Sequence, residues 1–232
     1  MNIIYLCNFI GRDILKDRKN FNELSQAANN KIMSIKESLE IYNCKVNILS
    51  VGDVNNKTFK FYNGFKSKEY NNVIYASILD IAFLNKITSL YYSYNTIKSM
   101  NKKDKVDYIV LYNYTIVNTI VGYLCKKFMN INVVIDYEDG LYNVDGINKI
   151  KKHVLIYLEK MMLKYISGTI IVTSKLKERC LNDKYVIARG IVNESLVEMS
   201  KLKKSKNNCT IIMYSGNLDE DRGRSEEHTS EL

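Results

Sequence analysis

Three apolar runs decide the fold class of this chain: Asp-Tyr-Ile-Val-Leu-Tyr at 107–112, Asn-Val-Val-Ile-Asp-Tyr at 132–137 and Thr-Ile-Ile-Val-Thr-Ser at 169–174. β-Branched residues are frequent in all three, and helical segments at 115–129 and 147–166 separate them. Apolar strands that alternate with helices are typical of a parallel sheet whose two faces are both covered. The sequence therefore predicts an α/β domain with a parallel sheet and helices on both faces.

The first half of the chain continues this alternation. Apolar runs without a helical period predict strands at 2–7 and 45–51. Apolar residues recur every three or four positions at 21–42, which predicts an amphipathic helix, and 77–100 is expected to be helical as well. The remaining predicted segments are a loop at 8–20, a loop or short strands at 52–72, a helix from Ser174 and a short strand at 185–188.

The composition fits a globular domain and favours an anionic partner. Of the 232 residues, 46% are hydrophobic and 25% are charged, which provides a core and excludes a disordered chain. The net charge of +9 attracts a membrane surface, a nucleic acid or a phosphorylated substrate without choosing among them. Five cysteines without a C-x-x-C pair and only two histidines predict neither a disulfide framework nor a metal site.

The sequence carries no signal for export or membrane insertion. Residues 2–7 lack a basic leader and a small-residue cleavage site, so they are interpreted as a strand and not as a signal peptide. The longest apolar stretch, 74–94, is interrupted by Asp80, Asn85 and Lys86 and does not predict a membrane span. We therefore expect a cytoplasmic protein.

The composition changes near the end of the chain. A segment rich in Lys and Ser at 200–208 predicts a linker between a first domain at 1–199 and the start of a second domain at 209–223. Residues 224–232 have no apolar period and resemble the in-frame translation of a sequencing-adapter oligonucleotide, so they are expected to be non-native and the natural protein longer. The alternative is a disordered acidic tail.

Function is sought in the loops that follow the strands, because open parallel sheets bind ligands beyond the carboxyl ends of their strands. The first such loop contains Gly11 and Arg12. Glycine permits a close turn, and a guanidinium offers a fork of donors to a phosphate or a sugar hydroxyl. The alternative is an exposed arginine beside a turn glycine, without a binding role.

An acidic cluster marks the end of the strand at 132–137. Asp136, Glu138 and Asp139 place three carboxylates within four positions, and Gly140 follows them. Clustered carboxylates lose hydration when a cleft closes over them and then need donors from a ligand, a cation or nearby bases. Sugar hydroxyls are such donors. The alternative is a solvated acidic turn that caps the next helix.

A third loop follows the predicted strand at 209–214. Gly216 permits close approach of the backbone to a ligand, and Arg222 is placed to return toward a phosphate. The sequence contains neither G-x-G-x-x-G after its first strand nor G-x-x-x-x-G-K-[ST]. This weakens a nicotinamide-binding or P-loop interpretation.

Six segments occur in the order that one enzyme family shows: Ala27-Ala28-Asn29-Asn30-Lys31, Tyr137-Glu138-Asp139-Gly140, Glu159, Ile170-Ile171-Val172-Thr173-Ser174, Ala188-Arg189-Gly190-Ile191, and Tyr214-Ser215-Gly216-Asn217-Leu218 leading to Arg222-Gly223. In this order the chain resembles the retaining glycosyltransferases of family four. These enzymes have the GT-B fold, which consists of two facing Rossmann-like domains. The resemblance implies that residues 1–199 are the Rossmann-like amino-terminal half of that fold, which binds the acceptor.

The resemblance also implies an activity of the hexosyltransferase type. A sugar would pass from a nucleotide-sugar donor to a glycan or lipid-linked acceptor in cell-surface polysaccharide synthesis. The implied site residues are Glu138 and Asp139 for catalysis, Gly11, Arg12 and Gly140 for the acceptor loops, and Gly216, Asn217 and Arg222 for the donor diphosphate. Asn217 stands where the family commonly has an arginine.

The family's donor-binding glutamates would lie beyond Gly223, so the 232-residue chain by itself is expected to be inactive. The nucleotide-sugar is a co-substrate, and no cofactor, metal or nucleic acid is expected. A basic face is expected to attract the anionic inner leaflet of the cell membrane. The alternative function is a noncatalytic flavodoxin-like or nucleic-acid-binding module, which only the charge and the tyrosine content favour.

Overall fold

The computed structural model describes residues 1–18, 26–51, 58–138, 149–180 and 184–188. These residues belong to the first of two units of the chain, Met1–Ile191. The segments predicted as linker, second domain and non-native tail, 200–232, lie outside the described residues.

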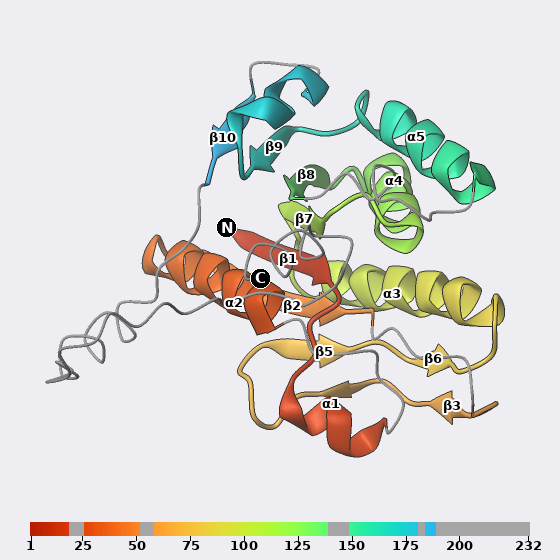
Figure 1. Ribbon diagram of the computed structural model, residues 1–232. Coiled ribbons are helices and arrows are strands. Elements are labelled where there is room, and N and C mark those ends of the chain that lie inside the picture. The colour runs from red at the N-terminus through yellow and green to blue at the C-terminus, as the bar shows by residue number, and fades with distance from the viewer. Residues whose placement is uncertain (19–25, 52–57, 139–148, 181–183, 189–232) are drawn as a thin grey trace, which may run out of the picture. The chain divides into compact units, whose positions relative to one another are not determined.

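An eight-stranded sheet forms the centre of the fold (Figure 1). Its order is β10-β9-β8-β7-β1-β2-β5-β4, and all neighbours are parallel except β5 and β4. The strands are β1 (Asn2–Cys7), β2 (Lys45–Ser50), β4 (Phe65–Lys66), β5 (Val73–Tyr75), β7 (Tyr108–Tyr112), β8 (Asn132–Tyr137), β9 (Gly168–Ile171) and β10 (Tyr185–Ile187). A separate antiparallel pair consists of β3 (Phe61–Tyr62) and β6 (Ile78–Leu79). The predicted parallel sheet is confirmed.

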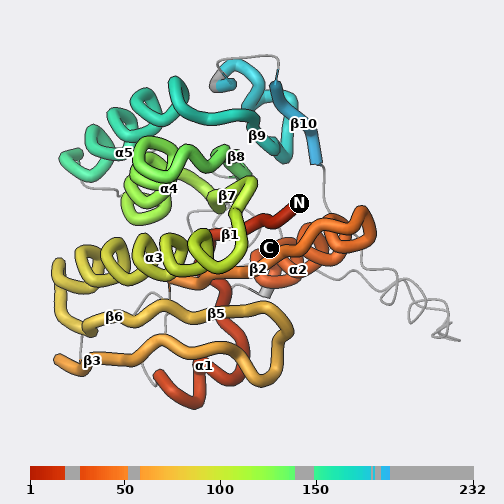
Figure 2. Tube along the Cα trace, turned by 180° about the vertical axis from the view of Figure 1, so that it is seen from behind, coloured from red at the N-terminus to blue at the C-terminus, as the bar shows by residue number. Residues whose placement is uncertain are grey.

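Helices cover both faces of this sheet. They are α1 (Arg12–Asp17), α2 (Gln26–Ile41), α3 (Leu84–Lys103), α4 (Ile116–Met129), α5 (Lys149–Met162) and the 3-10 helix η2 (Ser174–Arg179). In both views α4 lies between α3 and α5 (Figures 1 and 2). The core that these three helices share with the sheet is distinct from the core that α1 and α2 share with it.

The central strand β1 shows why its sequence is continuously apolar after Asn2. Successive side chains of a strand point to opposite faces. Ile4 and Leu6 pack in the core beneath α3, α4 and α5, whereas Ile3 and Tyr5 pack in the core beneath α1 and α2. All six residues of β1 are buried, because neighbouring strands flank it and helices cover both of its faces.

Two predicted segments differ in the structure. The predicted loop at 8–20 contains the short helix α1, and the predicted helix at 77–100 begins only at Leu84. Before that point, Ile78 and Leu79 form β6 and pair with β3. Pairing with a distant segment overrides the local helical preference, because it provides backbone partners and burial at the same time.

Candidate functional site

A cavity of about 270 Å³ lies at the carboxyl edge of the sheet. Parallel strands bring their carboxyl ends to one edge, and the cavity is lined there by Asn8 after β1, Val51 after β2 and Tyr112 at the end of β7. The amino-terminal parts of α3, α4 and α5 supply its remaining walls. The other described lining residues are Lys86, Ser89, Thr115, Ile116, Val117, Asn118, Lys151 and Leu155.

The cavity combines two cationic side chains with a helix amino terminus. Lys86 comes from α3 and Lys151 from α5. Thr115 caps α4, and its Oγ1 accepts a hydrogen bond from the N–H of Asn118 at 3.2 Å. The first turn of α4 contains no acidic residue, so the partial positive charge of the helix end is not offset there. This arrangement suits an anionic group.

Two buried polar side chains also line the cavity. The hydroxyl of Ser89 donates to the carbonyl of Val51 at 3.4 Å. The Nδ2 of Asn118 donates to the carbonyl of Tyr112 at 2.9 Å, which identifies its Oδ1 as an acceptor. This Oδ1 is buried and has no hydrogen-bond partner among the described residues. An unsatisfied buried acceptor costs about 1–3 kcal/mol, so a donor from a ligand or a water molecule would be favourable there.

An ion-pair network at the end of β8 adjoins the cavity through Tyr112. The Nζ of Lys31, on α2, lies 2.8 Å from Oδ1 of Asp136 and 2.7 Å from Oε1 of Glu138. Tyr5 on β1 donates to the second oxygen of Asp136, and Tyr112 on β7 donates to the second oxygen of Glu138. Each of the four carboxylate oxygens therefore has a partner.

Asn113 fixes the backbone beside this network. Its N–H donates to the carbonyl of Asp136 at 2.8 Å, and its Oδ1 accepts from the N–H of Glu138 at 2.8 Å. Its φ of 57° lies in the left-handed region, which asparagine tolerates better than most residues. These two hydrogen bonds connect the ends of β7 and β8, and Glu138 lies beside Tyr112, which lines the cavity.

Burial dominates the protonation of this network. It raises the pKa of Asp136, whereas Lys31 and Tyr5 lower that pKa by hydrogen bonding and the charge of Glu138 raises it. Burial raises the pKa of Tyr5 as well, and the charge of Asp136 adds to the effect. Tyr5 therefore remains a donor, and the ammonium of Lys31 is the group that favours two ionised carboxylates side by side.

Arg12 belongs to a second cavity of about 250 Å³. The side chain is exposed and lies on α1. The other described lining residues are Phe9, Ile10, Asn29, Asn30, Met33 and Tyr70. The cavity therefore joins the loop after β1 to the first turns of α2.

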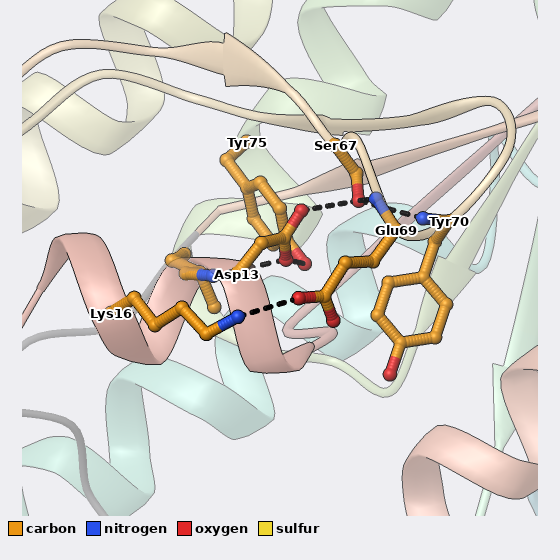
Figure 3. Close-up of polar contacts among 7 residues, drawn as sticks. Asp13, Lys16, Ser67, Glu69, Tyr70 and Tyr75 are labelled. Atoms are coloured by element: carbon orange, nitrogen blue, oxygen red, sulfur yellow. Dashed lines mark hydrogen bonds and ion pairs between the residues drawn. The ribbon is translucent and has the colours of Figure 1, made fainter.

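Polar contacts anchor α1, which carries Arg12, to the segment between β4 and β5 (Figure 3). Asp13 accepts a hydrogen bond from the hydroxyl of Tyr75 at 3.0 Å and another from Ser67. Lys16 pairs with Glu69 at 2.9 Å. These contacts fix the position of a helix that is too short to be stable alone.

Gly11 is needed for close packing. A Cβ at this position would lie 2.5 Å from Cε2 of Tyr70 and 2.6 Å from the hydroxyl of Tyr75. Its φ of −87° is one that any residue adopts, so the glycine is not required by backbone conformation. Its N–H donates to the hydroxyl of Tyr75 at 3.2 Å. The turn that the sequence predicts is thus the packed start of α1.

The structure separates the predicted site residues into groups. Gly11 and Arg12 start α1 beside the second cavity, whereas Glu138 belongs to the ion-pair network. The remaining predicted site residues lie outside the described residues: Asp139, Gly140, Gly216, Asn217 and Arg222.

Sequence reasoning missed the basic residues of the site. Lys31 stands on a predicted amphipathic helix, where a lysine indicates a solvated surface, and its partner Asp136 is 105 residues away. Lys86 and Lys151 also lie in predicted helices. In the sequence only Lys151 stands near the start of a predicted helix, at 147–166, which follows the strand at 132–137 and therefore begins near the edge where parallel sheets bind ligands.

Neither a metal site nor a membrane span is found in the described part of the chain. No three His, Cys, Asp or Glu side chains in it are grouped so that they could hold a metal ion. None of its helices is both long and apolar enough to cross a bilayer.

No family model and no curated protein sequence matches this chain, but solved structures do. Sucrose-phosphate synthase from Thermosynechococcus elongatus aligns with a TM-score of 0.58 at 15% identity, over 84% of this chain and 50% of that one. A shorter chain of the same enzyme aligns with a TM-score of 0.51 at 11% identity, over 87% of this chain and 97% of that one. A UDP-N-acetylglucosamine 2-epimerase aligns with a TM-score of 0.50 at 10% identity, over 81% of this chain and 47% of that one.

These likenesses concern the fold. The chain spans about half the length of the longer sucrose-phosphate synthase chain and of the epimerase. Both matched proteins have the GT-B architecture, in which two Rossmann-like domains face each other. The described residues therefore form an α/β Rossmann-like domain of the kind that GT-B proteins contain.

Proposed function

We propose that this chain is the acceptor-binding, amino-terminal domain of a retaining glycosyltransferase of family four. The whole protein would transfer a sugar from a nucleotide-sugar to a glycan or lipid-linked acceptor in cell-surface polysaccharide synthesis. The observation that carries this proposal is the cavity at the carboxyl edge of β1, β2 and β7, where open parallel sheets bind their ligands. The fold likeness to sucrose-phosphate synthase and to an epimerase named for a UDP-sugar supports it.

The proposed domain arrangement follows the change in composition along the chain. Residues 1–199 form the acceptor domain, 200–208 the linker and 209–223 the start of the donor domain, and 224–232 are non-native. The coverage of about half of the longer solved chains supports a second domain in the whole protein. Without that domain the 232-residue chain has no transfer activity.

The proposed roles of the site residues depend on closure of the two domains. Catalysis is assigned to Glu138 and Asp139, the acceptor loops to Gly11, Arg12 and Gly140, and the donor diphosphate to Gly216, Asn217 and Arg222. Glu138 is partly buried and bonded to Lys31 and Tyr112, so its carboxylate is held in one position beside Tyr112, which lines the cavity. An oriented carboxylate can accept hydrogen bonds from sugar hydroxyls without paying the entropy of ordering.

A transfer assay on the protein encoded by the complete gene tests this proposal. Glu138→Gln is expected to lower turnover about tenfold, because an amide cannot replace a charged acceptor. The measurement is transfer of labelled sugar from a panel of nucleotide-sugars, together with urea unfolding of each variant. Glu37→Gln, on the exposed face of α2, is the control and should change neither quantity. Transfer that is absent with every donor, or unchanged in Glu138→Gln, would contradict the assignment.

The proposed attachment to the inner leaflet is supported by α5. Ile150 and Tyr157 are 74% and 69% exposed, and Val154 between them is 39% exposed. Val154 follows Ile150 by four residues and Tyr157 follows Val154 by three, so the three side chains lie along one face of the helix. Exposed lysines, including Lys151 and Lys152, accompany them. Exposed apolar groups with neighbouring cations are typical of a helix that lies on an anionic membrane.

Vesicle binding tests this attachment. The double change Ile150→Glu and Tyr157→Glu is expected to weaken binding to vesicles of phosphatidylcholine and phosphatidylglycerol at least about tenfold, because two apolar groups lose their burial in lipid. Tyr42→Glu is the matched control, since Tyr42 is 81% exposed just after α2. Co-sedimentation is the measurement. Equal losses in the double variant and in Tyr42→Glu would indicate only a general charge effect.

A further inference from the structure

The charge of the larger cavity points to one class of acceptor. Its described lining residues include Lys86 and Lys151 and no carboxylate. The two lysines come from different helices, α3 and α5. The amino terminus of α4, the helix between these two in the sequence, also lies at the cavity and adds its partial positive charge. Three sources of positive potential from three elements at one cavity favour a ligand that carries negative charge.

The walls of the cavity strengthen this preference. Val51, Ile116, Val117 and Leu155 line it with apolar atoms. Lys86 and Lys151 are themselves exposed, so it is the apolar lining, and not burial of the cations, that reduces solvent screening around a bound group. At about 270 Å³, the cavity lies just below the range of about 300–1,000 Å³ that is usual for small-molecule sites, so it suits a compact group.

Asn118 adds a second requirement. Its Oδ1 is buried and has no partner among the described residues, while its Nδ2 is held by the carbonyl of Tyr112. An unpaired acceptor needs a donor, which a phosphate dianion does not provide and a hydroxyl group does. The ligand should therefore carry an anionic group together with at least one hydroxyl group.

We propose that this cavity binds the phosphate group of a phosphorylated, hydroxyl-bearing acceptor, with Lys86 and Lys151 as the cationic contacts. The proposal rests on the proposed function, because it takes the cavity to be the acceptor site. A soluble sugar phosphate and the phosphorylated head group of a lipid both have the required chemistry. Selection of a phosphorylated acceptor would then depend on this acceptor domain itself.

Titration of the 232-residue chain with defined probes tests the proposal. Calorimetry with inorganic phosphate, glucose 6-phosphate and glucose compares the anion, the anion with hydroxyls and the hydroxyls alone. Lys86→Gln and Lys151→Gln are each expected to weaken binding of glucose 6-phosphate about tenfold, because a charged hydrogen bond is lost. Lys98→Gln and Lys102→Gln, both on α3, are the controls, since both lysines are exposed and neither lines the cavity.

The outcomes separate the sources of the phosphate group. Tighter binding of glucose 6-phosphate than of glucose, lost in the two cavity variants only, supports a soluble phosphorylated acceptor. Binding only to phosphatidylcholine vesicles that contain phosphatidic acid, with the same dependence on Lys86 and Lys151, supports a lipid head group. Equal binding of glucose and glucose 6-phosphate without any binding to these vesicles, or equal losses in the control variants, would overturn the proposal.

Transfer by the protein from the complete gene separates this proposal from the proposed function. Transfer to phosphorylated acceptors that is unchanged in Lys86→Gln and Lys151→Gln would overturn the role of the cavity and leave the glycosyltransferase intact. Absence of transfer from every nucleotide-sugar, with lysine-dependent binding of glucose 6-phosphate preserved, would overturn the glycosyltransferase and leave the phosphate site.

Discussion

Replacing Lys31 with methionine is expected to lower the free energy of unfolding by about 3–5 kcal/mol, which is typical for breaking a buried ion pair by removing one partner. Asp136 is fully buried, and Lys31 is the cation that contacts both Asp136 and Glu138. Without it, the two carboxylates would face each other in a site that burial already makes unfavourable for charge. Methionine keeps most of the length of the side chain, so the change tests charge more than packing.

Urea unfolding near neutral pH measures this effect, and an exposed pair provides its control. Lys45 lies 2.7 Å from Asp104, but both side chains are more than half exposed, at 61% and 56%. Lys45→Met is therefore expected to cost no more than about 1 kcal/mol. Adding Asp136→Asn to Lys31→Met should recover part of the loss, because it removes one of the unpaired charges. Equal costs for Lys31→Met and Lys45→Met would show that the network does not stabilise the fold.

Replacing Glu159 with glutamine is expected to remove a pH dependence of stability that amounts to up to about 3 kcal/mol. Glu159 lies on α5 and is buried. Burial raises its pKa from 4.5 to about 7, and the charge of Lys160 lowers it in part. A carboxyl group whose pKa is raised by folding contributes its full stability below the unfolded value and loses it as the pH rises through the folded value. Glu159 therefore destabilises the protein progressively between about pH 4.5 and 7.

Unfolding of both proteins across this pH range measures the difference. The free energy of unfolding of Glu159→Gln should increase relative to that of the wild type as the pH rises, and the difference should become constant above about pH 8. Asp136, whose pKa is also raised, is present in both proteins and cancels. Glu37→Gln, at an exposed position of α2, is the control, and its free energy of unfolding should change with pH as that of the wild type does. A pH-independent difference would contradict the raised pKa of Glu159.

The sequence predicts the elements whose own residues show a burial pattern, such as the inner strands β1, β7 and β8 and the amphipathic helix α2. The runs that became β1, β7 and β8 are apolar because strands flank them and helices cover both faces, so the pattern is visible without knowing the partners. The short strand β6 and the short helix α1 were not predicted. Their stability depends on contacts with β3 and with Ser67 and Tyr75, which no local pattern contains.

The candidate site, too, is predictable from the sequence only in part. Parallel topology by itself places Glu138 and the loop after β1 at the carboxyl edge, and the chain's composition indicates an anionic partner. The residues that give this edge its chemistry, Lys31, Lys86 and Lys151, look like ordinary helix lysines in the sequence. Only the tertiary structure decides that Lys31 turns to two carboxylates while Lys86 and Lys151 line a cavity. The physical reason is that burial of an apolar run depends on the composition of the run itself. The role of a lysine depends instead on its surroundings, because the packing of distant segments decides which charges and cavities its flexible side chain can reach.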